Sequence, residues 1–409
     1  MKNEQKTITN ANEVRQNKPN VPTLRFPDFS EEWRSTPMKD VCSFAKGYGI
    51  AKENLSTEGT PCILYGELYT TYKTAIAKDI RSKTQLDPTD LFHSKANDVI
   101  IPCSGETAID IATSVCVPYD DVLLGGDLTV IRTKLNGAFL SNQLNGVRRK
   151  KIATIAQGAS IVHLHADELK KINIKYPTRE EQDKIAHFID CLDERIATQN
   201  KIIEDLKILK KELCNRYFKA VHENESLKYV TLSSVLTERK EYCEKDGTYT
   251  HGTLSKEGVA PKSERYDRDF LVKKEDKQYK VTHYNDICYN PANLKFGVIC
   301  RNTYGDLIFS PIYVTFEISN SVYPAYMELF LTNANFIGRI RRYEQGTVYE
   351  RMAVSSEDFL SYETRMPAYE EQVKFADKIQ RIHEKIELES AILDKYQSQR
   401  KYLLNAMFI

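Results

Sequence analysis

The sequence has no long apolar run and no clustered cysteines. No apolar segment approaches the roughly 18 residues that a membrane-spanning helix needs, and the N-terminal 20 residues are too polar for a secretory signal. The nine cysteines are scattered, odd in number and without a C-x-x-C pair, which disfavours both disulfides and a zinc site. We therefore expect a soluble, cytoplasmic protein with reduced thiols.

The chain also has almost no net charge. Its 58 Lys and Arg residues nearly balance 57 Asp and Glu residues, so a nucleic-acid partner would need locally concentrated positive charge. A hydrophobic fraction of 41% with 10% aromatics is typical of globular domains rather than disorder. With 409 residues, the chain is long enough for two or three domains, each with its own core.

Motifs for cofactor or metal chemistry are incomplete. Residues 47–49 start like a dinucleotide fingerprint, but Lys52 stands where the third glycine belongs. The segment NPAN at 290–293 lacks the second proline and the aromatic residue of adenine methyltransferases. His163 and His165 have no third ligand nearby in the sequence. We expect turns and ordinary polar histidines here, with no metal and no cofactor bound by this chain.

What the sequence does contain is a repeat. Residues 176–218 align with residues 366–408 at a constant offset of 190 and without a gap, and about a third of the positions match. The shared positions include the segment P-x-x-E-E-Q, at 177–182 and again at 367–372. Such a match over the whole segment predicts two copies of one structural element.

Both copies have apolar side chains at a helical spacing close to a heptad. Thr178 and Glu181 have the form of a capping box, which predicts that the first helix starts just after Pro177. A helix of about 40 residues is roughly 60 Å long. A helix face that stays apolar over about five heptads needs a partner helix. Gln199 and Glu389 occupy the same polar position in the two copies, and such a position can set the register of the paired helices. The predicted antiparallel coiled coil pairs through Ile185, Ile189, Leu192, Ile196, Ile203, Leu206, Leu213, Phe375, Ile379, Ile382, Ile386, Leu393, Tyr396 and Leu403.

The segments before the two helices repeat more faintly. Asn97-Asp98-Val99 and Asn285-Asp286-Ile287 each open a strand-like run, at an offset of 188. Strand signals at 128–133 and 313–318 mix with turns and short helices, which predicts two compact α/β or α+β domains. The predicted fold class is α+β, in the order flexible tail at 1–20, domain at 21–175, helix at 176–220, domain at 221–365 and helix at 366–409.

The two domains share scaffold positions but differ in their loops. Similar scaffolds with different loops indicate two domains of one type that recognise two different targets. Long paired helices would place the two recognition sites one DNA turn, roughly 34 Å, or more apart. This distance indicates a DNA target that is split into two parts. The loop residues suited to base edges are Lys46, Tyr48, Lys52, Ser104, Thr107, Lys256, Lys262, Arg265, Arg268, Asn290, Asn293 and Lys295.

Basic stretches precede Gln157-Gly158 and Gln345-Gly346, again 188 residues apart. Recurrence in both halves favours contacts to phosphates, which give affinity that depends on salt but not on sequence. The alternative is a solvated helix face. The residues concerned are Arg148, Arg149, Lys150, Lys151, Arg339, Arg341 and Arg342.

The layout and several local signatures resemble a known family, the specificity subunits of type I restriction-modification systems. The signatures are LRFPDFSEEW followed by PMKDV at 24–41, the run GASIVHLHADELKKINIKYP before the first P-x-x-E-E-Q, and the second P-x-x-E-E-Q. The resemblance covers nearly the whole chain after about residue 20.

The resemblance implies two target recognition domains, at 21–175 and 221–365, each binding one half of an asymmetric bipartite DNA site. It also implies spacer helices at 176–220 and 366–409 that are related by pseudo-two-fold symmetry, fix the spacing and dock two modification subunits. Those methyltransferase partners would bind S-adenosylmethionine, and two restriction subunits would use ATP and Mg, so this chain would be no enzyme. The alternatives are a stand-alone DNA methyltransferase or nuclease, whose cofactor loop or metal carboxylates are not found, and a coiled-coil adaptor.

Overall fold

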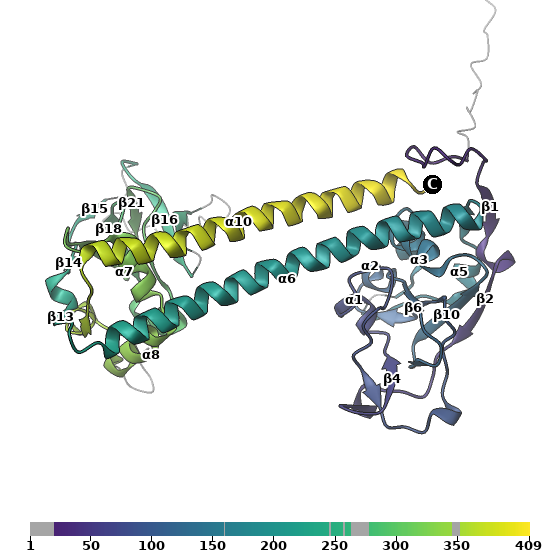
Figure 1. The fold of residues 1–409 in the computed structure, drawn as a ribbon, viewed down its shortest axis with the longest axis horizontal. Helices are drawn as coiled ribbons and strands as arrows, with labels where there is room; N and C mark the ends of the chain where they lie inside the picture. Colours follow the sequence, from purple (N-terminus) through teal and green to yellow (C-terminus); the bar gives the residue numbers. More distant parts are fainter. Residues whose placement is uncertain (1–19, 159, 245–246, 257, 263–277, 346–351) are drawn as a thin grey trace, which may run out of the picture. The chain divides into compact units, whose positions relative to one another are not determined.

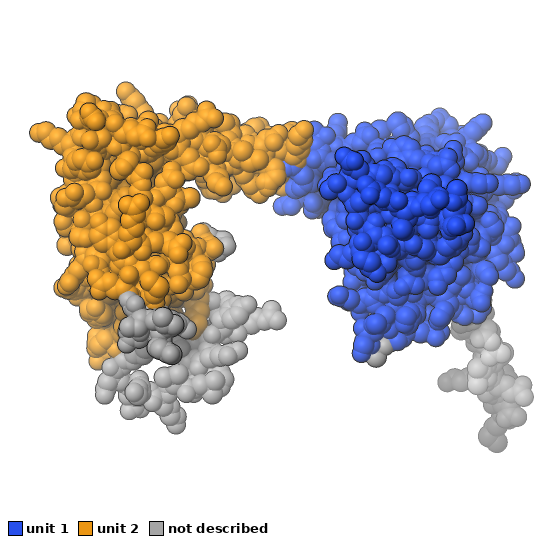
Figure 2. Space-filling view, turned by 90° about the horizontal axis from the view of Figure 1, so that it is seen from below, with its two compact units in different colours: residues 1–200, 391–409 blue, residues 201–390 orange. Residues whose placement is uncertain are grey.

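The computed structural model describes residues 20–158, 160–244, 247–256, 258–262, 278–345 and 352–409. The chain divides into two compact units, residues 1–200 with 391–409 (unit 1) and residues 201–390 (unit 2), which Figure 2 colours separately. The two segments of unit 1 lie at opposite ends of the chain. Arg265 and Arg268 of the predicted loop set, and nearly all of the predicted tail, lie outside the described residues.

The two repeated segments form the longest helices, α6 (Arg179–Glu223) and α10 (Tyr369–Ala406) (Figure 1). Each starts two residues after the proline of P-x-x-E-E-Q. Residues 179–200 of α6 and 391–406 of α10 belong to unit 1, and residues 201–223 and 369–390 belong to unit 2. Each unit therefore contains the start of one long helix and the end of the other.

The main sheets of the two units have the same topology. In unit 1 the order is β2 (Cys42–Lys46), β10 (Leu128–Thr133), β6 (Asp98–Pro102), β8 (Val115–Val117). In unit 2 it is β14 (Leu236–Glu238), β22 (Val314–Ile318), β19 (Ile287–Tyr289), β20 (Ile299–Arg301). All neighbours are antiparallel, and in both sheets the last strand in sequence lies between the first and the second. The prediction of two mixed domains of helix and sheet, each with a long helix, is confirmed.

The smaller elements also correspond. The antiparallel pairs β1 (Arg34–Pro37) with β12 (Asn173–Tyr176), and β13 (Tyr229–Thr231) with β23 (Glu363–Arg365), lead into α6 and α10. In the described parts of the chain, three short α-helices follow the last main-sheet strand in each unit. They are α3 (Gly137–Asn145), α4 (Arg149–Ile155) and α5 (Ala166–Lys170) in unit 1, and α7 (Pro324–Leu331), α8 (Ala334–Ile340) and α9 (Ser356–Leu360) in unit 2. The scaffold is thus duplicated beyond the long helices.

The second sheets differ. Unit 1 has β3 (Leu55–Ser56), β5 (Lys83–Thr84), β4 (Thr60–Ile63) and β9 (Leu123–Leu124), with a separate pair β7 (Ser104–Gly105) and β11 (Val162–His163), and helices α1 (Glu67–Thr70) and α2 (Ala108–Ile111). Unit 2 has β15 (Tyr242–Cys243), β18 (Tyr279–Thr282), β21 (Leu307–Phe309), β16 (Thr250–Ser255) and β17 (Gly258–Pro261). The two units therefore differ in their second sheets, although their main sheets have the same topology.

The end of a long helix completes the core of each unit. Phe408, just after α10, packs against Trp33 and Phe139 in unit 1, with ring centroids 6.4 and 5.1 Å apart. Phe218, near the end of α6, packs against Tyr326 in unit 2 at 5.6 Å. Phe218 and Phe408 occupy matched positions of the repeat. The repeat therefore extends to the apolar anchors that close the two cores.

Within each unit the two long-helix segments pack against each other. In unit 1, Arg195 lies 5.6 Å from the ring centre of Tyr396, and Arg400 bonds to Asp193, so α10 runs opposite to α6 there. In unit 2, Tyr217 near the end of α6 stacks on Phe375 at the start of α10, at 3.6 Å.

The predicted pairing residues lie on the inner side of these helices. Ile185, Ile189, Leu192, Ile203, Ile379 and Leu403 are buried, and Ile196, Leu206, Leu213, Phe375, Ile382, Ile386, Leu393 and Tyr396 are half-buried. The polar slots Gln199 and Glu389 are both buried as well. The heptad pattern did not predict the burial of Cys214, Phe218 and Val221 against unit 2.

The glutamine of P-x-x-E-E-Q explains why that segment is repeated. In unit 1 the side chain of Gln182 accepts a hydrogen bond from the backbone N–H of Asn136 and donates one to the carbonyl of the proline in its own motif, both 2.9 Å long. Gln372 makes the same pair of bonds in unit 2, with Tyr323 as the donor and again at 2.9 Å. Asn136 and Tyr323 cap α3 and α7. One side chain thus fastens the start of each long helix to its domain.

The predicted capping box is wrong for Glu181. Its buried carboxylate accepts two hydrogen bonds of 2.7 Å from the guanidinium of Arg25. The bidentate charged pair engages both carboxylate oxygens of Glu181. Glu181 therefore ties the N-terminal segment to the start of α6.

Candidate nucleic-acid interface

The strand register of unit 1 brings three loops to one edge of the main sheet. Strand β2 ends at Lys46, opposite Thr129, and β6 ends at Pro102, opposite Leu128 at the start of β10. Because these neighbours are antiparallel, the loops at 47–50, 103–107 and 125–127 meet. We call these three loops the loop edge of unit 1.

Asp127 lies at the centre of this loop edge. Its Oδ1 atom is 3.9 Å from Nζ of Lys46, and its Oδ2 atom accepts a hydrogen bond of 3.2 Å from the hydroxyl of Ser104. Its backbone carbonyl accepts a bond of 2.7 Å from the N–H of Cys103. The side chains of Lys46 and Asp127 remain 69% and 49% exposed. A cation and an anion are therefore both presented to solvent from fixed loops.

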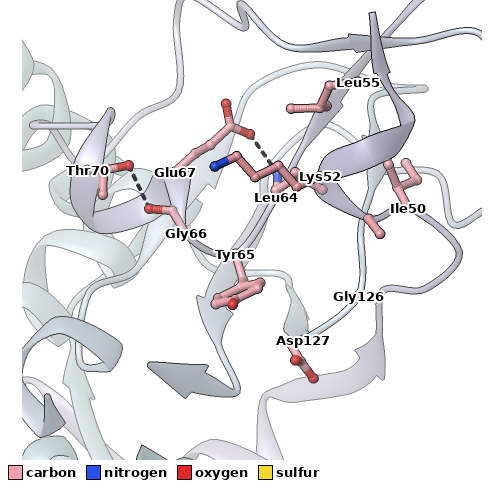
Figure 3. Close-up of a pocket in the computed structure, with 11 residues that line it drawn as sticks. Ile50, Lys52, Leu55, Leu64, Tyr65, Gly66, Glu67, Thr70, Gly126 and Asp127 are labelled. Atoms are coloured by element: carbon pink, nitrogen blue, oxygen red, sulfur yellow. Dashed lines mark hydrogen bonds between the residues drawn. The ribbon is translucent and has the colours of Figure 1, made fainter. Parts of the chain in front are cut away.

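Two hollows flank Asp127. One, of about 630 Å³, is lined by apolar side chains such as Ile50 and Leu64 together with Lys52 and Tyr65 (Figure 3). The other, of about 390 Å³, is lined by Lys46, Asp127, His163 and His165, among others. Concave apolar surface with a few polar groups is typical of ligand-binding sites. The two histidine rings stack with centroids 6.5 Å apart, and both residues are exposed.

The other loop residues predicted in unit 1 differ in how exposed they are and in whether they bond to the protein itself. Tyr48 is 52% exposed, with its ring edge against Phe92. Lys52 is exposed at the start of a single turn of 3₁₀-helix. Ser104 is buried beneath Asp127, and Thr107 caps α2 by accepting a bond of 3.2 Å from the N–H of Asp110. Tyr48 and Lys52 are thus accessible, whereas Ser104 and Thr107 already have structural roles.

The basic stretch of unit 1 divides into two parts. Arg148 donates to the carbonyls of Asn173 and Ile409, at 2.9 and 2.8 Å, and burial lowers the pKa of its guanidinium. Arg149 donates to the carbonyl of Ile109 at 3.1 Å. The exposed members are Lys150 and Lys151. The protein itself holds the two arginines, so we keep the phosphate prediction for the two lysines.

Unit 2 has a corresponding loop edge. Strand β19 ends at Tyr289, opposite Val314 at the start of β22, so residues 290–298 and 310–313 meet there. Phe296 and Ile312 are exposed on this edge, by 57% and 63%. Lys295 places its ammonium 5.4 Å from the ring centre of Phe296. The same sheet edge thus carries different chemistry in the two units.

The remaining predicted residues of unit 2 are distributed around this domain. Asn290 is buried and caps a 3₁₀-helix by accepting a bond of 3.1 Å from Ala292, and Asn293 is half-buried in that helix. Lys256 is exposed in the turn between β16 and β17, and Lys262, after β17, is half-buried. The basic residues at α8 comprise half-buried Arg339 and exposed Arg341 and Arg342.

Comparison with known proteins shows what the chain is similar to. Residues 30–207 match the family model described as the type I restriction modification DNA specificity domain. The chain is similar to the specificity subunits of type I restriction-modification systems. It is 23% identical over 426 aligned positions, covering 95% of both chains, to a protein of Methanocaldococcus jannaschii described as a type I restriction enzyme MjaX specificity subunit. The resemblance predicted from the sequence is confirmed.

Solved structures share the fold of this chain. The S subunit of a type I restriction-modification system from M. genitalium matches with a TM-score of 0.58 at 15% identity, covering 95% of this chain and 99% of that one. A chain from a structure on complex assembly and conformational transition of the type I R-M system matches with a TM-score of 0.55 at 14% identity, covering 91% and 96%. The likeness extends over both units.

Two buried aspartates belong to the scaffold of the two units. Asp98 and Asp286 hold matched positions of the two main sheets, and each pairs with an arginine, Arg132 at 3.2 Å and Arg239 at 2.7 Å. Both aspartates are 3% exposed. Both domains have such a pair at the same place, and in each pair the arginine neutralises the buried carboxylate. These aspartates therefore have a structural role.

His283 extends this charged cluster in unit 2. Its ring nitrogens lie 2.8 Å from Asp306 and 3.1 Å from Glu241. Burial lowers the pKa of the imidazole, but the two carboxylates raise it more, and the net shift is upward. The cluster is therefore a pH-sensitive support of this domain.

Two further properties hold for the described residues. Among them, no group of three or more His, Cys, Asp or Glu side chains is arranged to hold a metal ion. Nor does any helix in the described ranges have the length and apolar character to cross a membrane.

Sequence reasoning missed Asp127, Tyr65 and the place of His163 and His165 beside them. An isolated aspartate in a loop is usually taken as a turn residue. The usable signal was its place directly before the strand at 128–133, in a Gly-Gly-Asp segment, where only the register of the sheet brings it to Lys46.

Proposed function

We propose that this chain is a DNA-recognition subunit without catalytic activity of its own, in which each unit reads one half of a bipartite DNA target. The observation that carries the proposal is the duplicated sheet with different loops at the same edge. A repeated scaffold presents its loops in equivalent ways, while different loops read different bases. An asymmetric target follows from that difference.

We also propose that the long helices set the distance between the half-sites and dock two modification subunits. Several large apolar side chains of the helices are exposed in unit 2, as a partner surface requires. They are Ile202, Ile208, Leu209 and Leu388, with exposures of 39%, 58%, 47% and 55%. In this proposal the modification subunits bind S-adenosylmethionine and flip and methylate one adenine in each half-site. Two restriction subunits that use ATP and Mg join the same assembly, and this chain binds none of these cofactors.

The test is to co-express the chain with its modification subunit in a host free of adenine methylation and to sequence the DNA for N6-methyladenine. The proposal predicts one split motif with a fixed gap and one methylated adenine in each half. If a stable complex forms but no motif is methylated, DNA recognition is refuted and an adaptor role is favoured. Methylation by the chain alone would instead make it an enzyme.

A further inference from the structure

We propose that Asp127 and Lys46 together read one G·C base pair in the half-site bound by unit 1. Asp127 would accept a hydrogen bond from N4 of cytosine, and Lys46 would donate to both O6 and N7 of guanine. The inference rests on the proposed function and deepens it, because it assigns a base pair to one unit. Asp127 is the added specificity-determining residue.

The chemistry of the pair matches the major-groove edge of G·C. Guanine presents two acceptors there and cytosine one donor, and Lys to guanine and Asp to cytosine are both established pairings. In the base pair, O6 of guanine and N4 of cytosine are hydrogen-bonded to each other at about 3 Å. An ammonium and a carboxylate 3.9 Å apart therefore present a donor and an acceptor at a similar separation. T·A also presents an acceptor beside a donor, O4 and N6, in the same order. G·C is therefore distinguished by the contact of Lys46 with N7 of guanine, where T·A has the thymine methyl group.

The surrounding loops fix this arrangement before any DNA binds. Ser104 and the N–H of Cys103 hold the side chain and the backbone of Asp127. A Cβ at Gly47 would lie 2.3 Å from the carbonyl oxygen of Gly125, so the loops at 47–50 and 125–127 touch backbone to backbone. Asp127 itself has a φ of 57°, in the left-handed region. Residues held in such conformations by their surroundings are found disproportionately at functional sites.

The ion pair can open at little cost. Exposed pairs of this kind contribute little to stability, and both side chains here are about half or more exposed. Exchanging the pair for contacts with a base pair therefore leaves the fold intact. By the register of the two main sheets, unit 2 has Ile312 in place of Asp127 and Lys240 in place of Lys46, so it lacks the carboxylate of the pair. The two halves of the target are accordingly read differently.

Asp127→Asn tests the inference. Asn keeps the shape of the side chain and also adopts the left-handed region, but it supplies donors as well as an acceptor, the pattern that reads adenine. The matched control is Asp121→Asn, which changes an exposed aspartate with a φ of 60° that pairs with His93 in the same domain. Each variant is co-expressed with the modification subunit, and methylated adenines are mapped across the genome.

For the wild type we expect a G·C pair at a fixed position in one half-site. With Asp127→Asn, discrimination at that position should fall about tenfold or shift to A·T, as expected for one lost base contact. The other half-site and the gap should not change, and Asp121→Asn should give the wild-type motif. Lys46→Gln should weaken the choice at the same position.

Three results would overturn the inference. They are an unchanged motif with Asp127→Asn, a change in the other half-site, and loss of all methylation although the complex with the modification subunit is recovered intact. In each case the wild-type motif still tests the proposed function separately. A wild-type complex that methylates no split motif would remove the proposed function itself.

Discussion

The ring of Phe408 lies edge-on to Trp33, with centroids 6.4 Å apart, although the two residues belong to opposite ends of the chain. Unit 1 therefore cannot complete its core until the end of α10 is in place. The matched residue Phe218 does the same in unit 2. Each domain depends on a helix that starts elsewhere in the chain.

We expect Phe408→Ala to destabilise unit 1 by about 3–5 kcal/mol, because it removes a fully buried aromatic ring. Trp33 is the single tryptophan of the chain, so its fluorescence during urea unfolding follows this unit. The control is Tyr402→Ala, since Tyr402 on the same helix is 63% exposed. Equal midpoints for the two variants would show that the end of α10 does not support the core.

Gln182→Ala should lower the free energy of unfolding of unit 1 by about 1–3 kcal/mol, because a buried N–H and a carbonyl lose their partner. The bonds concerned are those to Asn136 and Pro177. The fluorescence of Trp33 again gives the measurement. Gln399→Ala changes an exposed glutamine of α10 in the same unit and should cost little. A cost for Gln182→Ala no larger than for this control would refute the fastening role.

Lys150→Ala together with Lys151→Ala should weaken binding to all DNA sequences alike. If each lysine contacts one phosphate, the slope of log affinity against log salt should fall by about 2. Fluorescence anisotropy with the cognate duplex and an unrelated duplex gives both values. Arg148→Ala is the contrasting variant, since Arg148 bonds to Asn173 and Ile409, and should lower stability instead. A changed sequence preference in the double lysine variant would mean that these residues read bases.

Unit 2 should lose stability as the pH rises through the folded-state pKa of His283. That pKa is raised above the ordinary value of 6.5, since two carboxylates outweigh the effects of burial and of Arg239. A raised folded pKa means that the native state holds the proton more tightly, so this stabilisation is complete below about pH 6.5 and is lost above it. Hydrogen exchange of unit 2 peptides, corrected for intrinsic rates, measures the trend.

His283→Gln should flatten this dependence on pH. His383→Gln, which removes an imidazole from an exposed part of α10, controls for the loss of a histidine elsewhere in unit 2. Asp306→Asn should reduce the slope without abolishing it, because Glu241 remains 3.1 Å from the ring. A wild-type protein whose unit 2 gains stability above pH 6.5 would contradict the assignment.

What the sequence predicted depended on how local each signal was. The heptads of α6 and α10 repeat within a few residues, so the helices and their buried sides followed from periodicity. Glu181 was assigned to a local cap, but its partner Arg25 is 156 residues away. Arg148 seemed free for DNA, but its partner Ile409 is 261 residues away. Asp127 entered the candidate site only through the register of β10 with β2 and β6. Pairings over such separations have no signature in a single sequence.

The central claim is that each unit reads one half of the target. The most direct test is the methylated motif obtained with the double variant Asn293→Ala and Lys295→Ala, which alters only the loop edge of unit 2. The account predicts altered bases in one half-site, with the other half-site and the gap unchanged. Changes in both half-sites, or a changed gap with the same bases, would contradict it.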